Sequence, residues 1–285
     1  MKVSLILATY GRAEELERAV DSFLAQTDRE FELIVVDQNP DERLLPYVQK
    51  AQQGGLDVQH VRMDKPGLSP ARNRGIALAR HDILAFPDDD CWYEAQAIEQ
   101  VRRAFQADAQ LKGVIGCWVE QAGTTAPTHA YLLDNAAWRQ FRGGNASSIS
   151  LFFNRALFQS LGGFDERFGV GQWYGAAEET DFVLRALATG ARLQYCPEVR
   201  VHHAYAPRPT GSFGTICRQA RRRSRGTGAI YAKHKLSAYV VARGLVAPVI
   251  TPLSQLAHPS LLVRGLFTSL GRIEGYLRWK IRESK

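Results

Sequence analysis

Cysteine is scarce in this chain of 285 residues, and its four cysteines stand far apart. They are Cys91, Cys117, Cys196 and Cys217, and they form no C-x-x-C pair. Structural zinc sites and the disulfide frameworks of small secreted domains both rely on closely spaced cysteines. We therefore expect free thiols in a reducing compartment and no zinc site.

We expect no secretory leader at the start of this sequence. The apolar run from Val3 to Ala8 is shorter than the apolar core of a signal peptide, and polar residues follow it at once. The run has instead the length and composition of a buried strand. We do not expect export, and we expect the chain to act in the cytoplasm.

Acidic residues are nearly absent from the last third of the chain. Residues 200–285 hold 16 Lys and Arg against 2 Asp and Glu, whereas residues 1–199 hold 20 against 27. Such an excess of positive charge favours a polyanion: nucleic acid, anionic lipid or a phosphorylated substrate. The densest cluster, Arg221–Arg225, has no interleaved aromatic residues, so we do not expect nucleic acid as a partner. A solvated helix face is the alternative for these arginines.

Charge is absent altogether from residues 245–263, a stretch of 19 residues that is long enough to span a bilayer. Pro248, Pro252 and Pro259 interrupt it, and a spanning helix needs an unbroken backbone. A transmembrane helix, a segment at the membrane surface and a packed helical pair all remain open. We favour a surface segment beside the basic residues, on the inner face of the plasma membrane.

The first hundred residues alternate strand patterns with helix patterns. This alternation predicts an α/β fold with a mostly parallel sheet and helices on both faces. We expect this domain to cover residues 1–205, followed by a basic, partly apolar helical region at 206–285. Strands are expected at 3–8, 31–36, 58–61 and 83–86, and helices at 13–25, 46–53, 70–79 and 93–107.

Polar residues follow three of these expected strands. Thr9 follows the first, Asp37 the second, and the run Asp88–Asp90 the fourth. Ligands of parallel sheets bind beyond the carboxyl ends of the strands. We therefore expect these residues to share a site, although Asp37 could equally be a turn or capping residue.

The three adjacent carboxylates of Asp88–Asp90 repel one another unless a cation holds them. Carboxylate oxygens suit Mg²⁺ or Mn²⁺, with a substrate phosphate completing the coordination shell. A solvated acidic turn that caps the next helix is the alternative. The triplet by itself does not decide between the two.

Several motifs occur together in one order, and jointly they resemble family 2 glycosyltransferases of the GT-A fold. The resemblance covers roughly residues 3–205 and implies a Rossmann-like sheet, a nucleotide-sugar donor and transfer with inversion at the sugar carbon. The segments that carry it are Ser4–Arg12, Ala19–Thr27, Glu32–Asp37, Gly67–Gly75, Phe86–Asp90, Leu161–Glu166, Glu178–Asp181 and Pro197–His203.

The resemblance implies roles for individual residues on the donor side. Asp88 and Asp90 match the D-x-D pair, with Asp90 the expected metal ligand, and either His202 or His203 matches a metal-binding histidine. The metal is expected to be Mg²⁺ or Mn²⁺. Asp89 is counted with the donor, although it could instead cap the helix that follows. The expected donor-binding residues are Thr9, Tyr10, Arg12, Asp37, Arg72, Asp88 and Asp89.

On the acceptor side, the resemblance assigns the base to Glu179, which here replaces a commoner aspartate. Glu178 and Asp181 remain alternatives for the same role. Asn145 and Trp173 are expected to contact the acceptor, because amide and aromatic side chains suit sugars; ordinary packing is the alternative.

The expected reaction is transfer of a single sugar to a glycan or polyprenyl-diphosphate-linked acceptor in surface-polysaccharide synthesis. The donor is expected to be a UDP-, GDP- or dTDP-sugar. Processive relatives carry a Gln-x-x-Arg-Trp motif, which residues 219–223 lack. A nucleotidyltransferase of similar fold is the second interpretation, but its Gly-rich loop is missing after Ala8. Binding to an anionic membrane surface is expected as well.

Overall fold

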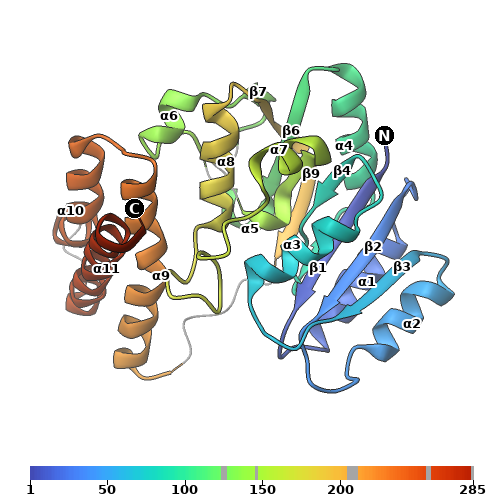
Figure 1. The fold of residues 1–285 in the computed structure, drawn as a ribbon, viewed down its shortest axis with the longest axis horizontal. Coiled ribbons are helices and arrows are strands. Elements are labelled where there is room, and N and C mark those ends of the chain that lie inside the picture. Colours follow the sequence, from blue (N-terminus) through green and yellow to red (C-terminus); the bar gives the residue numbers. More distant parts are fainter. Residues whose placement is uncertain (123–126, 145–146, 204–210, 255–257, 284–285) are drawn as a thin grey trace. The chain divides into compact units, whose positions relative to one another are not determined.

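The computed structural model describes residues 1–122, 127–144, 147–203, 211–254 and 258–283. The chain divides into two compact units, whose elements are labelled in Figure 1. Unit 2 includes two segments, 136–144 and 165–184, that the expected boundary at residue 205 assigns to the first domain. Unit 1 consists of Met1–Asn135, Asn145–Phe164 and Arg185–Tyr205, and unit 2 of Ala136–Gly144, Asp165–Leu184 and Ala206–Lys285.

Unit 1 is built on a mixed sheet. Its strands are β1 (Val3–Thr9), β2 (Phe31–Asp37), β3 (Asp57–Arg62), β4 (Ile83–Ala85), β5 (Cys91–Tyr93), β6 (Leu111–Trp118), β7 (Tyr131–Leu132), β8 (Leu151–Asn154) and β9 (Arg192–His203). Within the described residues they form one nine-stranded sheet in the order β3-β2-β1-β4-β8-β6-β9-β5, with β7 beside β9. The four strands β1 to β4 pair in parallel, whereas β8 is antiparallel to both of its neighbours.

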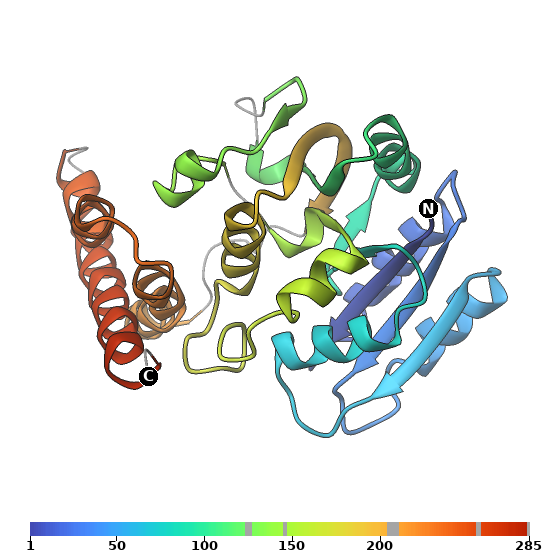
Figure 2. The ribbon, with the colours of Figure 1, turned by 45° about the horizontal axis from the view of Figure 1, so that its top comes forward.

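Both β1 and β2 are buried along their whole length, as expected for strands that are covered on both faces. One face is covered by α1 (Glu15–Leu24), α2 (Leu45–Gln53) and α4 (Ala97–Ala107), whose apolar residues join Leu5 and Leu33 in one core. The other face carries α3 (Leu68–Leu78) and α7 (Arg155–Leu161). In Figure 2, α3 lies in front of the sheet and α1 behind it.

Close contacts explain how α3 and α7 fit their face. Gly75 of α3 lies so near Ile6 of β1 that a Cβ atom there would be 2.3 Å from Ile6 Cγ2. Phe158 of α7 packs on Phe86 and Phe153, with ring centroids 5.1 and 5.9 Å apart. The remaining short elements of unit 1 are α5 (Val119–Ala122) and the 3-10 helix Ser148–Ser150.

The prediction of a helix at 93–107 is wrong for residues 93–96, which precede the observed helix. Cys91–Tyr93 is strand β5, which pairs antiparallel with β9 and places Cys91 opposite His203. Tyr93 is buried, and its hydroxyl donates to the carbonyl of Ile149 at 3.0 Å. The helix begins at Ala97, so Asp89 does not cap it. This pairing brings the acidic triplet to the end of β9.

Unit 2 is helical in its described residues. It contains α9 (Phe213–Lys233), α10 (Ala238–Ser254), α11 (Pro259–Arg278) and a short π-helix at Trp279–Glu283, together with most of α6 (Asn135–Arg139) and the first part of α8 (Glu178–Ala188). The uncharged stretch at 245–263 is thus divided between α10 and α11. Among the described helices, none combines the length and apolar character that crossing a membrane requires.

Glycines allow α9 and α11 to approach closely. A Cβ atom on Gly228 of α9 would lie 1.9 Å from the carbonyl oxygen of Arg272, and one on Gly275 of α11 would lie 1.9 Å from that of Arg225. Such distances exclude any side chain unless the helices move apart. Helix α10 joins this pair through Ser269 of α11, whose hydroxyl donates to the carbonyl of Leu245 at 2.6 Å.

We expect Gly228→Ala to separate α9 from α11 and to lower the free energy of unfolding by about 1–3 kcal/mol, the usual cost of overpacking. Gly214→Ala on the same helix is the control, since its Cβ would meet no atom closer than 3.6 Å. That control should be neutral or stabilising, because alanine favours helix. Urea unfolding of both variants measures the difference, and equal stabilities would contradict the close approach.

Candidate active site

The carboxyl end of β1 delivers two side chains to the acidic triplet. The hydroxyl of Thr9, the last residue of the strand, donates to Asp89 Oδ2 at 2.6 Å. Arg12 Nη1 contacts Asp89 Oδ1 at 2.7 Å and Asp90 Oδ2 at 2.5 Å. Asp89 therefore ties the triplet to the first loop of the sheet.

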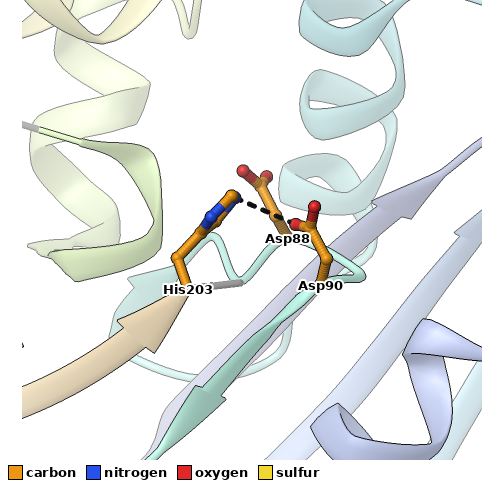
Figure 3. Close-up of side chains that lie close together, drawn as sticks. All are labelled: Asp88, Asp90 and His203. Carbon is orange, nitrogen blue, oxygen red and sulfur yellow. Dashed lines mark ion pairs between the residues drawn. The ribbon is translucent and has the colours of Figure 1, made fainter. Parts of the chain in front are cut away.

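Asp88, Asp90 and His203 converge at the end of β9 (Figure 3). One ligand atom from each lies within 4.8 Å of the other two. His203 Nε2 is 3.0 Å from Asp90 Oδ1, but this buried oxygen has no hydrogen-bond partner among the described residues. Two carboxylates and one imidazole form a donor set that Mg²⁺ or Mn²⁺ accepts, and an ion would satisfy the buried oxygen. The three residues fit the expected metal.

Asp89 and Asp90 differ in the pKa of their carboxyl groups. Burial alone would raise the pKa of Asp90, but the nearby His203 and Arg12 outweigh it and hold that pKa below the ordinary value. For Asp89 burial prevails: its pKa is raised, although Thr9 and Arg12 bond to the carboxylate. Asp90 is thus the more strongly acidic of the two, as a metal ligand needs to be, while Asp89 is enclosed by its own partners.

Arg72 of α3 supplies a buried positive charge beside the triplet. Its side chain is 1% exposed, and Nη2 donates to Asp88 Oδ1 at 2.9 Å and to Ser148 Oγ at 2.7 Å. The guanidinium carbon lies 5.7 Å from the ring centroid of Phe164. Sequence reasoning missed Ser148, whose surroundings carry no distinctive motif. The arrangement fixes a buried guanidinium next to Asp88.

Asp37 lies at the end of β2, directly opposite Thr9 in the parallel register. Its Oδ1 accepts from the backbone N–H of Asn39 at 2.8 Å and from the Asn39 amide at 2.9 Å, and its Oδ2 lies 3.0 Å from His60 Nε2. Asn39 in turn accepts from the backbone N–H of Gly11 at 2.7 Å. The ends of β1, β2 and β3 are thus joined by side chains around Asp37.

A pocket of about 560 Å³ opens at these strand ends. Sequence reasoning identified only Tyr10 among its lining residues. It missed the Gln-Asn pair directly after Asp37, and no sequence signal pointed to Arg62. Another pocket, of about 380 Å³, contains none of the expected site residues. The first pocket is lined by Tyr10, Gln38, Asn39, Pro40, Arg62, Met63, Asp64 and Pro66.

His202 has different surroundings from His203. Its Nδ1 lies 2.7 Å from Glu120 Oε1 and its Nε2 lies 3.1 Å from Glu94 Oε1. Its ring stacks on Trp92 with centroids 5.2 Å apart. Successive side chains of a strand point to opposite faces, so only one of the two histidines can reach the triplet. The structure places His203 there.

The three candidate bases lie in the first turn of α8, in unit 2. Asp181 is fully buried, and its Oδ1 lies 2.7 Å from Lys233 Nζ and 2.9 Å from His234 Nε2. Glu178 is buried and Glu179 half-buried. The Asp181 carboxylate thus holds α8 against the end of α9.

Trp173 also lies in unit 2, where cations crowd its ring. The guanidinium carbons of Arg225 and Arg278 lie 4.4 and 4.1 Å from the ring centroid. Stacking of this kind stabilises helix contacts within the unit. Asn145, the other expected acceptor residue, lies outside the described residues.

Comparisons with known proteins found a matching family model and several similar proteins. The family model described as Glycosyl transferase family 2 matches residues 4–158. A Haloferax volcanii protein described as glucosyl-dolichyl phosphate glucuronosyltransferase is 33% identical over 223 residues, which make up 71% of this chain and 69% of that protein. A Bacillus subtilis protein described as uncharacterized glycosyltransferase YwdF is 27% identical over 72% of this chain and 75% of its own length.

Two similar solved structures confirm the expected fold. The mannosyltransferase PcManGT from Pyrobaculum calidifontis, in complex with GDP-Man and Mn²⁺, has a TM-score of 0.67 and 17% identity, covering 99% of this chain and 88% of its own. TarS 1–349 of S. aureus, in complex with UDP-GlcNAc, has a TM-score of 0.59 and 15% identity, covering 95% and 90%. At these identities the likeness shows the α/β fold of GT-A type and nothing finer.

We expect His203→Ala to weaken Mn²⁺ binding at least tenfold, because it removes one of three clustered ligands. His202→Ala removes a histidine from the same strand without touching the cluster, and it should bind Mn²⁺ like the wild type. Isothermal titration of each protein with Mn²⁺ measures the dissociation constants. Stronger loss in His202→Ala than in His203→Ala would contradict the site.

Proposed function

The chain belongs to glycosyl transferase family 2, and from this membership we propose that it moves one sugar from a nucleotide-sugar donor to a hydroxyl of a lipid-linked glycan acceptor. The observation that carries the proposal is the cluster of Asp88, Asp90 and His203. Residues 9–12 connect this cluster to the pocket at the strand ends, through Arg12 on one side and Tyr10 on the other.

In this proposal the nucleoside occupies the pocket at the strand ends. Asp37 accepts two hydrogen bonds from Asn39, which lines the pocket, and its other oxygen contacts His60. Tyr10 and Arg62 line the opening, where an aromatic ring can stack on a base and a guanidinium can reach an oxygen. UDP-, GDP- and dTDP-sugars all remain candidates. GDP-Man and UDP-GlcNAc are the ligands of the two similar solved structures.

The donor diphosphate is proposed to lie at the acidic cluster. Asp88, Asp90 and His203 would hold Mg²⁺ or Mn²⁺, which when bound supplies positive charge for the departing diphosphate. Arg12 and Arg72 add fixed cations on either side of the triplet. Asp89 holds Arg12 and Thr9 in place.

We assign the acceptor base to Glu179. A carboxylate within hydrogen-bond reach of the acceptor hydroxyl takes its proton as the oxygen attacks the sugar carbon. A single displacement of this kind inverts that carbon. Asp181 is excluded from our assignment because its carboxylate is buried and paired with Lys233 and His234. Glu178 is the alternative, and Trp173 and Asn145 stay proposed acceptor contacts.

The lipid-linked acceptor is inferred from the Haloferax volcanii relative, whose name includes a dolichyl phosphate. A polyprenyl-diphosphate-linked glycan at the cytoplasmic face of the plasma membrane is the corresponding acceptor here. This reaction would belong to the synthesis of a surface glycan. The basic charge of residues 200–285 fits an anionic membrane surface.

Thermal-shift screening identifies the donor. We expect one sugar nucleotide to raise the melting temperature in the presence of Mn²⁺ and to do so far less without it, since a ligand bound only by the folded state stabilises that state. Asp90→Ala should abolish the Mn²⁺-dependent part of the shift. A full shift in Asp90→Ala, or none with any sugar nucleotide, would refute the donor site.

Glu179 and Asp181 of α8 should respond differently to removal of their charge. Glu179→Gln should lower kcat by about 10²–10⁴-fold and leave donor binding intact, as for loss of a general base. Asp181→Asn should lower the free energy of unfolding by on the order of 3 kcal/mol, because it breaks a buried ion pair. Turnover assays and urea unfolding of both variants measure this. Near-normal kcat in Glu179→Gln would move the base to Glu178.

A further inference from the structure

One side of α11 is apolar and exposed. Apolar residues recur along it at intervals of three or four, which places them on one face of the helix. The glycines that pack on α9 and α10 lie on other faces, so this row is not used within unit 2. With Ile281 of the π-helix that follows, we call it the α11 stripe: Leu266, Leu270, Ile273, Leu277 and Ile281, with exposed fractions of 51, 47, 39, 50 and 66%.

Helix α10 carries a second exposed apolar row, whose members are seven, four and three residues apart and so also share one face. Its packed side includes Val240, which is buried, and Gly244, which lies against the hydroxyl of Tyr231. The exposed row lies on the opposite side of the helix. We call it the α10 stripe: Tyr239, Val246, Ile250 and Leu253, with exposed fractions of 64, 49, 54 and 53%.

The helical part of unit 2, from α9 to the π-helix at Trp279–Glu283, carries many positive charges and few negative ones. Glu274 is bound by Arg221 and Arg225, so its charge is neutralised within the unit. Glu283, at the end of the π-helix, is the other acidic residue in the described residues 211–254 and 258–283. The exposed basic residues are Arg218, Arg222, Arg223, Lys235, Arg264, Lys280 and Arg282.

We propose that the α10 and α11 stripes dock this chain on an anionic lipid surface, with both helices lying in the headgroup region. Single exposed apolar residues need no explanation, but two continuous rows on neighbouring helices indicate a binding surface. An anionic surface matches both features, since apolar faces enter the interface while Lys and Arg meet the headgroups. The inference extends the proposed function, because a lipid-linked acceptor lies at such a surface.

A second copy of the chain is the other occupant to consider. Pairing two copies through these stripes would bring two strongly basic surfaces together, and their repulsion would oppose the contact. Anionic headgroups attract the same charges. The charge pattern therefore favours lipid over self-association.

The test uses the full chain and sedimented vesicles, either neutral (phosphatidylcholine) or anionic (phosphatidylcholine with phosphatidylglycerol). The wild type should bind anionic vesicles far better than neutral ones. Leu270→Gln/Leu277→Gln should reduce binding to anionic vesicles at least tenfold. The matched control is Leu132→Gln/Val170→Gln, which changes exposed apolar residues outside the stripes and should bind like the wild type. Circular dichroism verifies that both variants fold.

A third variant, Arg264→Gln/Lys280→Gln/Arg282→Gln, should lose the preference for anionic vesicles. Equal vesicle binding by wild type and Leu270→Gln/Leu277→Gln would overturn the proposal. The proposal would also be overturned if the protein formed a dimer in solution that Leu270→Gln/Leu277→Gln dissociates, and if none of the proteins bound vesicles.

Hydrolysis of the sugar-nucleotide donor, measured without vesicles, distinguishes failure of membrane docking from failure of the proposed function. If hydrolysis persists but docking fails, only this inference fails, whereas absent hydrolysis and absent donor binding would refute the proposed function.

Discussion

Three consecutive carboxylates lie close together, and the rest of unit 1 provides arginines and hydrogen-bonding side chains that offset their mutual repulsion. Asp88 has Arg72, Asp89 has Thr9 and Arg12, and Asp90 has Arg12 and His203. These partners come from β1, the loop after it, α3 and β9. Neutralising the triplet therefore requires elements from across the sheet to meet at one point.

The order and pairing of the strands bring these elements together at one edge of the sheet. Parallel pairing of β1 with β2 aligns Thr9 with Asp37, so that the loops beyond both strands leave the sheet at the same edge. Antiparallel pairing of β5 with β9 then sets Cys91 opposite His203, next to Asp90. The two pairings join a polar pocket to an acidic cluster. The pocket and the cluster that we propose for the nucleoside and its diphosphate thereby lie in one unit.

Unit 2 has a different physical basis, because close helix packing and buried ion pairs hold it together. Glycine lets α9 and α11 touch backbone to backbone, and Lys233 bonds to both Asp165 and Asp181. Burial would raise the pKa of Asp165, but Arg167 and Lys233 hold it well below the usual range. The same close packing leaves the outer sides of α10 and α11 uncovered.

The sequence by itself determined the alternation of strands and helices, the polar residues at the strand ends and the family, because these follow from local periodicity and from motifs in a fixed order. Only the tertiary structure separated His203 from His202, placed Tyr93 in a strand rather than at the start of a helix, and paired Asp181 with Lys233 and His234. Each of these depends on partners that are distant along the chain. His234 lies 53 residues beyond Asp181, and the residue that Cys91 faces in the sheet lies farther still. Local pattern cannot specify which distant side chain fills a space; packing of the whole unit decides it.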